Sequence, residues 1–146
     1  MGLIKDLGKG PTCLDTAPFI YFIEEHKEYS PVIESVFRAL DQGKLQAVTS
    51  ALTLAEVLVV PFRNNNPGLA QKYEDFLSRC RGLHLVDIDR FILREAAYLR
   101  AVSSVKMPDA IQIATALRCG CSTLVTNDRK LPRIPGLKIL QLGDYA

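Results

Sequence analysis

The chain has 146 residues, and its 18 Lys and Arg against 16 Asp and Glu give a formal net charge of +2. Hydrophobic residues make up 48% and charged residues 23%, as in ordinary globular domains, which argues against disordered, fibrous and coiled-coil proteins. The length fits one domain over residues 1–146 and leaves no room for a second full domain. Because the charge is nearly balanced, a nucleic-acid partner has to be inferred from local chemistry.

Targeting and redox features indicate the cellular setting. No run reaches the roughly 18 consecutive apolar residues of a membrane helix, and the N-terminus lacks the pattern of a signal peptide. Four cysteines are too few for a disulfide scaffold in a chain of this size. We therefore expect a cytoplasmic protein with reduced, buried thiols and no membrane partner.

The first part of the chain predicts a strand and two helices. Residues 1–11 are rich in glycine, so we expect a loose N-terminal lead-in there. The short strand at 12–14 is followed by a turn in which Thr16 is placed to cap a helix. A second helix begins near Pro31 and keeps apolar residues at helical spacing until Gly43, which ends it.

The middle of the chain continues this alternation of strands and helices. A strand at 45–49 leads to Ser50, which is placed to cap a helix that Pro61 stops. After a turn rich in Asn, Pro and Gly, a helix is predicted over about 69–80. The third strand follows at 83–86.

The last part of the chain completes the pattern. Asp89 caps one helix and Pro108 opens another, and strands follow at 123–126 and 137–140. Strands that alternate with helices predict a three-layer α/β/α sandwich with a mainly parallel sheet of about five strands. Ligands bind such sheets beyond the carboxyl ends of the strands, so residues directly after each strand are candidates for a site.

Four carboxylates occupy such positions or otherwise stand out. Asp15 directly follows the first strand, Asp128 follows the fourth, and Asp109 lies in the first turn of a helix. Each alone has an ordinary explanation as a helix cap, a turn residue or an acid near a helix N-terminus. Glu56 has apolar neighbours one helical turn away, and a lone buried carboxylate is costly unless it is paired, neutral or bound to a cation.

Together the four acids suggest a metal site. In a doubly wound sheet they can converge on one pocket, where their mutual repulsion is relieved by a hard divalent cation such as Mg²⁺ or Mn²⁺. Such an ion polarises a phosphodiester and lowers the pKa of a bound water, which gives a nucleophile near neutral pH.

Four segments of the chain resemble the acidic blocks of the PIN domain, in the order and spacing of its small bacterial members, the VapC-type toxins of toxin–antitoxin pairs. The segments are LDTAPFIYFI, TSALTLAEVLVV, MPDAIQIATAL and TLVTND. The resemblance spans about residues 12–142. It implies a parallel α/β/α sandwich, a metal-dependent ribonuclease site and an antitoxin partner.

The resemblance also implies roles for particular residues. The acidic quartet, which would hold the metal and carry catalysis, consists of Asp15, Glu56, Asp109 and Asp128. Thr126 matches a frequent Ser or Thr that orients ligands or water, Thr16 follows the first acid, and Asn127 receives no role. The chain departs from the family after Asp128, because Arg129-Lys130-Leu131 stands where many toxins carry an aromatic residue.

Two further features concern partners. Lys106, Arg129 and Lys130 lie close in sequence to two of the acids and could hold an RNA phosphate backbone, although solvated surface is the simpler interpretation. The apolar residues from Val57 to Phe62 exceed what one buried helix face needs. They indicate core packing, a groove for an antitoxin helix, or the interface of a homodimer.

The leading hypothesis is therefore a Mg²⁺- or Mn²⁺-dependent endoribonuclease restrained by an antitoxin. A haloacid-dehalogenase-type phosphatase also places an Asp after its first strand, but it needs a second Asp where this chain has Ala17. A non-catalytic PIN-like module that binds RNA or protein is the alternative from a different class. The spatial separation of the four acids discriminates between a shared site and a generic α/β domain.

Overall fold

A five-stranded sheet lies at the centre of the computed structural model, which describes residues 2–146. The strand order is β3-β2-β1-β4-β5, and every neighbouring pair is parallel. The strands are β1 (Thr12–Leu14), β2 (Ala47–Ser50), β3 (Leu83–Val86), β4 (Thr123–Thr126) and β5 (Lys138–Gln141). The predicted parallel α/β fold is thus confirmed.

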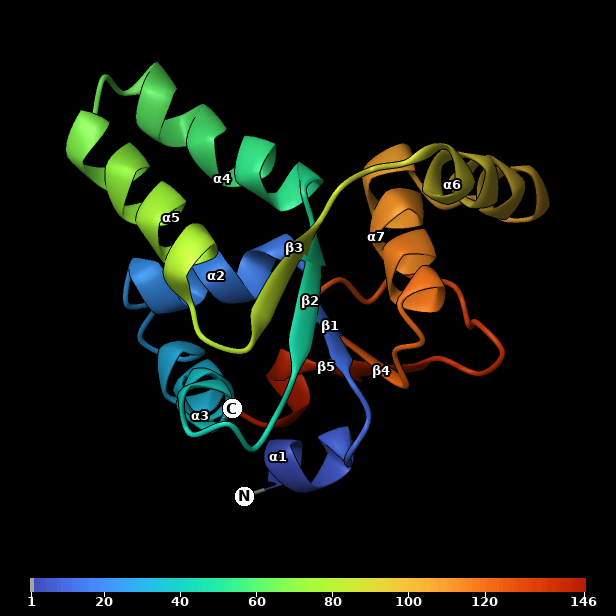
Figure 1. Cartoon of the computed structure of the whole chain (residues 1–146), viewed down its shortest axis with the longest axis horizontal. Coiled ribbons are helices and arrows are strands. Elements are labelled where there is room, and N and C mark those ends of the chain that lie inside the picture. Colours follow the sequence, from blue (N-terminus) through green and yellow to red (C-terminus); the bar gives the residue numbers. More distant parts are fainter. Residues whose placement is uncertain (1) are drawn as a thin grey trace.

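Helices cover both faces of this sheet (Figure 1). One face packs α2 to α5 and the other packs α6 and α7, with each side forming its own buried cluster. The helices are α1 (Gly2–Leu7), α2 (Thr16–Ile23), α3 (Ser30–Asp41), α4 (Leu52–Arg63), α5 (Pro67–Arg79), α6 (Arg90–Val102) and α7 (Met107–Arg118), and a short 3-10 helix, η1 (Leu142–Asp144), follows β5. Among the described helices, none has both the length and the apolarity to cross a membrane.

The two central strands show how the sequence builds both cores. Successive side chains of a strand point to opposite faces, and a parallel sheet is covered on both. In β1, Cys13 enters the core under α6 and α7, whereas Leu14 enters the core under α2 to α5. In β4, Leu124 and Val125 divide in the same way. All four side chains are fully buried, so the middle of the sheet is a rigid base for whatever follows its strands.

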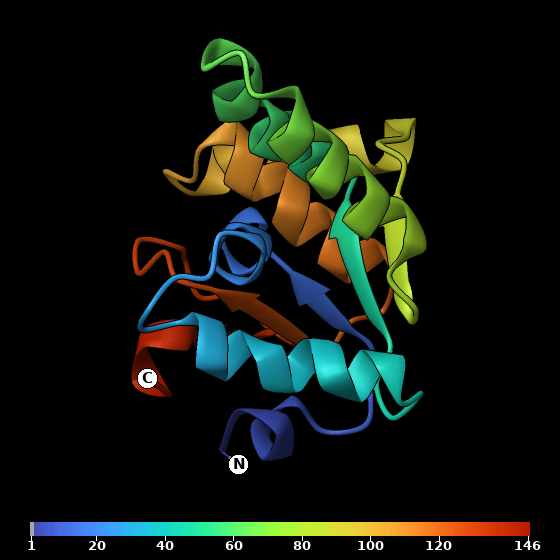
Figure 2. The same cartoon turned by 90° about the vertical axis from the view of Figure 1, so that its left-hand side faces the viewer.

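The prediction of a loose lead-in at residues 1–11 is wrong for Gly2–Leu7, which forms a helix, and residue 1 lies outside the described residues. Leu3 and Leu7 are four residues apart, so they share one face of α1, and both are buried. Tyr145 at the other end of the chain donates a hydrogen bond from its hydroxyl to Asp6 Oδ2 at 2.5 Å. Figures 1 and 2 show both termini at the same end of the molecule, near α3.

Two predicted helix boundaries also differ from the structure. Pro61 does not stop α4, which continues to Arg63; the proline ring is buried, and only two helical residues follow it. A proline this close to a helix end interrupts few hydrogen bonds. At α2, the N-cap residue is Asp15 rather than Thr16, because the Asp15 carboxylate accepts from the backbone N–H of Thr16.

The sheet topology selects one place for a site. The chain builds β1, β2 and β3 outward in one direction and then returns to place β4 on the other side of β1. Strand order therefore reverses between β1 and β4, and a crevice forms at the carboxyl ends of two such strands. Asp15 directly follows β1, and Asp128 lies two residues after β4.

Candidate metal centre

Asp15 joins the ends of the two central strands. Its Oδ1 accepts from the Thr16 backbone N–H at 2.8 Å, which caps α2. Its Oδ2 accepts from the hydroxyl of Thr126 at 2.8 Å, across the switch point. Its own backbone N–H donates to the carbonyl of Val125 at 3.0 Å and so extends the ladder between β1 and β4. The carboxylate orientation is thus fixed from two sides.

Thr126 connects Asp15 to Asp128. It is fully buried at the last position of β4. Because its hydroxyl proton goes to Asp15, the oxygen is left to accept, and it accepts from the Asp128 backbone N–H at 3.1 Å. One buried hydroxyl therefore sets the relative position of two of the four acids.

Glu56 approaches the same region from α4. Its Oε1 accepts from the hydroxyl of Thr16 at 2.5 Å, so the residue after Asp15 orients a second acid. The expectation of a sealed apolar environment is wrong in part. Glu56 is half-buried, and two of its predicted apolar neighbours, Val59 and Val60, are 47% and 52% exposed.

The pKa of Asp109 depends on all three of the other acids. Asp109 lies in the first turn of α7 and is half-buried. Its pKa is raised from the ordinary 3.8 to about 6. Burial is the largest cause, the charges of Asp15, Asp128 and Glu56 contribute in that order, and Lys106 acts in the opposite direction. Carboxylates that lay on different sides of the domain would not exert these effects. The structure therefore brings the four acids into one electrostatic environment.

The donor set suits a hard divalent cation. All four side chains offer oxygen atoms, which Mg²⁺ and Mn²⁺ prefer. Within residues 2–146 the ion pairs are Arg38–Glu34 and Arg129–Asp144, so no Lys or Arg there forms an ion pair with the quartet, and only the charge of Lys106 acts on Asp109 from a longer distance. Across the same residues, however, no three acidic, His or Cys side chains are gathered closely enough to enclose an ion. The acids influence one another electrostatically, and a metal would have to draw them together.

A cavity of about 280 Å³ opens beside two of the acids. Asp109 and Asp128 line it together with Lys106 and Lys130. These two lysines are both exposed, so their ammonium groups can reach an anion in the cavity while their charge remains hydrated. The cavity thus combines acidic groups with two of the three predicted phosphate-binding residues.

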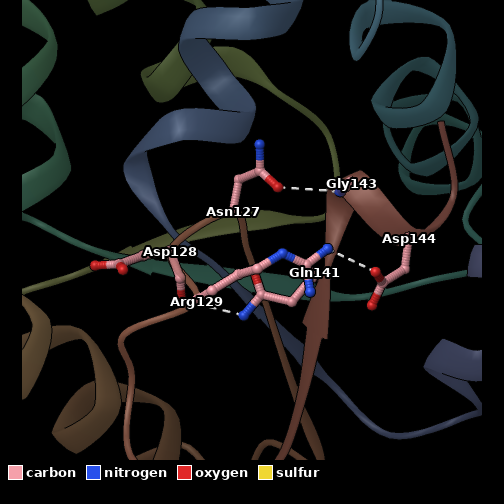
Figure 3. A network of polar contacts seen from close by, with 6 residues as sticks. All are labelled: Asn127, Asp128, Arg129, Gln141, Gly143 and Asp144. Atoms are coloured by element: carbon pink, nitrogen blue, oxygen red, sulfur yellow. Dashed lines mark hydrogen bonds and ion pairs between the residues drawn. The ribbon is translucent and has the colours of Figure 1, made fainter.

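Arg129, the third predicted phosphate-binding residue, is directed elsewhere. Its Nη2 lies 2.6 Å from Oδ1 of Asp144, and both side chains are exposed. Figure 3 shows the guanidinium reaching toward Asp144, while the Asp128 carboxylate points away from it. As the structure stands, Arg129 ties the loop after β4 to the C-terminal segment instead of facing the cavity.

Two more contacts tie this loop to the C-terminal segment (Figure 3). Gln141 Nε2 donates to the Asp128 backbone carbonyl at 3.1 Å, and the Gly143 N–H donates to Asn127 Oδ1 at 3.0 Å. A Cβ at Gly143 would lie 3.3 Å from Asn127 Oδ1 and 3.2 Å from Arg129 Nη2, so a side chain would crowd the loop. Asn127, which received no role from the sequence, therefore helps to hold the backbone beside Asp128.

Sequence reasoning also missed a buried polar group beneath the acids. Thr53 stands one helical turn before Glu56, and Gln112 stands one turn after Asp109. Both are buried among apolar side chains and hydrogen-bond to each other. The sequence did contain a sign of this pair. On the apolar face of each of the two predicted helices, one polar residue stands three positions from a candidate acid.

Solved structures of toxins share this architecture. A toxin–antitoxin complex from Klebsiella pneumoniae has 26% identity, covers 86% of this chain and 94% of its own, and has a TM-score of 0.65. VapBC2 from Rickettsia felis, bound to a DNA fragment from its promoter, has 22% identity, covers 90% and 98%, and has a TM-score of 0.68. VapC20 from Mycobacterium tuberculosis, described as a toxin that cleaves the sarcin–ricin loop, has 12% identity, covers 82% and 91%, and has a TM-score of 0.65. At these identities, the last two show the fold alone.

The family follows from the sequence match. No curated protein matches the chain. The family model described as the PIN domain matches residues 12–137, a range that runs from the start of β1 to just before β5 and includes all four acids. The chain therefore belongs to the PIN domain family.

Proposed function

We propose that the chain is a Mg²⁺- or Mn²⁺-dependent endoribonuclease that hydrolyses RNA phosphodiester bonds, and that it is the toxin of a toxin–antitoxin pair. The observation that carries this proposal is the hydrogen-bonded arrangement at the switch point, where Thr126 joins Asp15 to Asp128 and Thr16, the residue after Asp15, donates to Glu56. The raised pKa of Asp109, to which burial and then the three other acids contribute, agrees with it. Uncompensated carboxylates at a switch point of the sheet are an arrangement that a divalent ion stabilises. Family membership supports the same chemistry, because PIN nucleases generally use divalent metal ions.

In this proposal Asp15, Glu56, Asp109 and Asp128 hold the ion. When bound, the metal supplies a polarised phosphate and a water of lowered pKa. Thr126 keeps Asp15 and Asp128 in register, and Thr16 aims one oxygen of Glu56. Lys106 and Lys130 bind phosphates of the RNA strand beside the acids and so hold the scissile bond in place.

Cleavage of RNA is the direct test. The purified protein is incubated with total RNA in Mg²⁺, in Mn²⁺ and in chelator, with Asp15→Asn as the matched control. We expect cleavage in either metal, none in chelator and none by the variant. Cleavage that persists in chelator, or that Asp15→Asn retains, contradicts the assigned site and indicates a contaminating nuclease.

A non-catalytic RNA- or protein-binding module is the second candidate. The observation in its favour is that the carboxylates do not enclose a ready-made ion site within the described residues 2–146. Such a module would bind RNA equally well in chelator and never cut it. Binding without cleavage at any metal concentration would establish this alternative over the first.

An antitoxin is the proposed protein partner, in keeping with the toxin–antitoxin complexes among the structural neighbours. A hollow of about 740 Å³ between α3 and α5 has an apolar floor that includes Phe22, Phe37 and Phe76, and a rim of charged residues. Such a surface suits the apolar side of an amphipathic segment, and we assign the antitoxin to it. All four cysteines are free thiols, which is consistent with the proposed cytoplasmic location.

A homodimer is the proposed assembly of the toxin itself. Val57 and Leu58 are buried, but Val59, Val60 and Phe62 form an exposed apolar strip on α4. Closed dimers are the commonest symmetric assemblies, and a second copy would cover this strip. Sedimentation at micromolar concentration should give a dimer for the wild type and a monomer for Phe62→Lys. A wild-type monomer would contradict this assignment.

A further inference from the structure

Gln112 is a polar residue in the most buried helix of the structure. Every residue of α7 from Ala110 to Ala116 is buried, and the Gln112 amide is enclosed with them. Its Oε1 accepts from the Ser50 backbone N–H at 2.9 Å, and its Nε2 donates to Thr53 Oγ1 at 3.2 Å. Because a backbone N–H can only donate, the oxygen must face Ser50, and the amide orientation follows.

Thr53 is the second member of this buried group, and its hydrogen bonds can be assigned by counting protons. The Thr49 hydroxyl donates to the Leu14 carbonyl at 2.7 Å, so it can only accept from Thr53, which lies 2.7 Å away. Thr53 thus uses its single proton on Thr49 and accepts from Gln112. Each hydroxyl has a partner, and the group links the ends of β1 and β2 to α4 and α7.

This group lies directly beneath two of the acids. Glu56 is three residues after Thr53 on α4, and Asp109 is three residues before Gln112 on α7, so each acid stands one helical turn from its buried neighbour. At the start of α4 the Ser50 hydroxyl accepts from the Leu52 N–H at 3.1 Å, and the bonds of Gln112 to Ser50 N–H and Thr53 Oγ1 join this first turn to α7. A buried polar group that satisfies all its partners fixes one arrangement of the elements around it.

We propose that Thr53 and Gln112 are positioning residues that set the separation of Glu56 and Asp109. The inference rests on the proposed function, since the two acids are assigned there as metal ligands. The hydrogen bond between Thr53 and Gln112 joins α4 to α7 below the carboxylates, and its loss lets the two helix starts drift apart. The Thr16 hydroxyl, which donates to Glu56, lies 3.3 Å from Thr53 Oγ1, but both hydroxyl protons are used elsewhere, so the two side chains are in packing contact without a hydrogen bond.

The test compares Thr53→Val with Thr53→Ser and with Thr12→Val. Valine keeps the shape of Thr53 but removes the hydroxyl, whereas serine keeps the hydroxyl. Thr12 is the matched control, because it is buried at the amino end of β1, the opposite end of the strand from Asp15, and accepts from the Thr123 hydroxyl at 2.7 Å. Gln112→Met is a second variant on α7 that removes the amide with little change in volume.

The first readouts are Mn²⁺ affinity by calorimetry and the kinetics of RNA cleavage. We expect Thr53→Val and Gln112→Met to weaken Mn²⁺ binding about tenfold and to lower kcat by a similar factor without changing KM for RNA. Thr53→Ser should restore both quantities. Thr12→Val should lower the melting temperature by a few degrees and leave both unchanged. Wild-type Mn²⁺ affinity in folded Thr53→Val would overturn the proposal.

A metal-free readout separates this inference from the proposed function. In chelator, Asp109→Asn should stabilise the protein, because burial and, after it, the charges of the other acids disfavour the ionised carboxylate; the charge part of this gain depends on how close Asp109 is held to them. We expect the gain in the free energy of unfolding by urea to be smaller in the Thr53→Val background and unchanged in the Thr12→Val background. An equal gain in both backgrounds refutes the positioning role. Failure of the wild type to bind Mn²⁺ or cut RNA refutes only the proposed function.

Discussion

The acids of the site are supported in two contrasting ways. Glu56 and Asp109 stand on helices that a fully buried group of threonines and an amide holds together. The backbone N–H of Asp128 donates to the buried Thr126 hydroxyl, but its loop is otherwise held by the C-terminal segment, through Gln141, Gly143 and an ion pair whose two side chains are 62% and 56% exposed. That segment follows residue 137, where the match to the PIN domain model ends.

The two supports differ in how much water can replace their hydrogen bonds. Inside the protein a hydrogen bond is strong and its loss leaves an unsatisfied group, whereas at the surface water replaces a lost partner. Salt also screens exposed charges at distances beyond about 8–10 Å. The Glu56 and Asp109 side should therefore be rigid and indifferent to salt, and the Asp128 side should be the adjustable part of the site.

Asp15 belongs to both supports, so Asp15→Asn should have the largest effect. The variant removes a charge from the quartet and turns an NH₂ group toward either Thr16 N–H or the Thr126 hydroxyl, both of which donate to the carboxylate. Loss of a residue that only hydrogen-bonds to a metal ligand typically lowers metal affinity or activity by about 10–100-fold. Loss of Asp15, a proposed ligand itself, should therefore lower the cleavage rate by more than about 100-fold. It should also destabilise the fold by about 1 kcal/mol. Single-turnover cleavage and urea unfolding measure the two effects, and near-normal cleavage would remove Asp15 from the site.

Asp109→Asn should stabilise the metal-free fold, whereas Asp15→Asn should destabilise it. The folded state raises the pKa of Asp109 from 3.8 to about 6 by burial and by the neighbouring acids. The ionised form is therefore disfavoured in the fold, and stability is lost as pH rises from about 4 to 6. In chelator at pH 7 the variant should gain about 1 kcal/mol, after a discount for the partial exposure of this group, or about 2–4 °C in Tm.

The pH dependence is the control for this second prediction. Near pH 3.5 Asp109 is mostly protonated in both the folded and unfolded states, so the advantage of asparagine should almost vanish. Thermal unfolding in chelator at pH 3.5 and pH 7 distinguishes the two conditions. A gain of equal size at both values would mean that packing, and not charge repulsion, explains the stabilisation.

Gln141→Met tests the support on the Asp128 side. It removes the hydrogen bond to the Asp128 carbonyl, and with it the buried Gln141 Oε1, which has no partner within the described residues, so part of the lost stabilisation is offset. We expect a loss of about threefold in cleavage, which corresponds to about 0.5–1 kcal/mol, and a smaller loss than for Thr53→Val. Cleavage assays on the two variants side by side make the comparison. A larger effect of Gln141→Met would reverse the proposed ranking of the two supports.

The sequence predicted the elements well and their polar contacts poorly, for a physical reason. Buried parallel strands are short apolar runs between residues typical of turns, so short windows of the sequence are enough to predict how strands and helices alternate. The partners of Gln112 and Asn127 are distant: Gln112 accepts from Ser50, 62 positions away, and Asn127 accepts from Gly143 across β5. Such contacts exist only once the fold is known. The helix at Gly2–Leu7 was missed because its two core leucines stand among glycines and charged residues.

The smallest predicted effect concerns the exposed ion pair between Arg129 and Asp144. Surface pairs contribute about 0–1 kcal/mol, so Asp144→Asn should leave stability almost unchanged. It should release Arg129, whose backbone follows Asp128 directly, and raise the affinity for single-stranded RNA about twofold at low salt. Arg129→Gln should lower that affinity and reduce the salt slope of binding by about one.

Fluorescence anisotropy with a short labelled RNA, in chelator to prevent cleavage, measures both variants over a range of salt. If Arg129 only braces the loop, Asp144→Asn and Arg129→Gln remove the same contact and should change binding in the same direction. If Arg129 also reaches a phosphate once freed, the two variants should change it in opposite directions. Changes of RNA affinity in opposite directions would place Arg129 among the substrate-binding residues with Lys106 and Lys130. The ion pair with Asp144 in the C-terminal segment would then be what keeps Arg129 from the RNA.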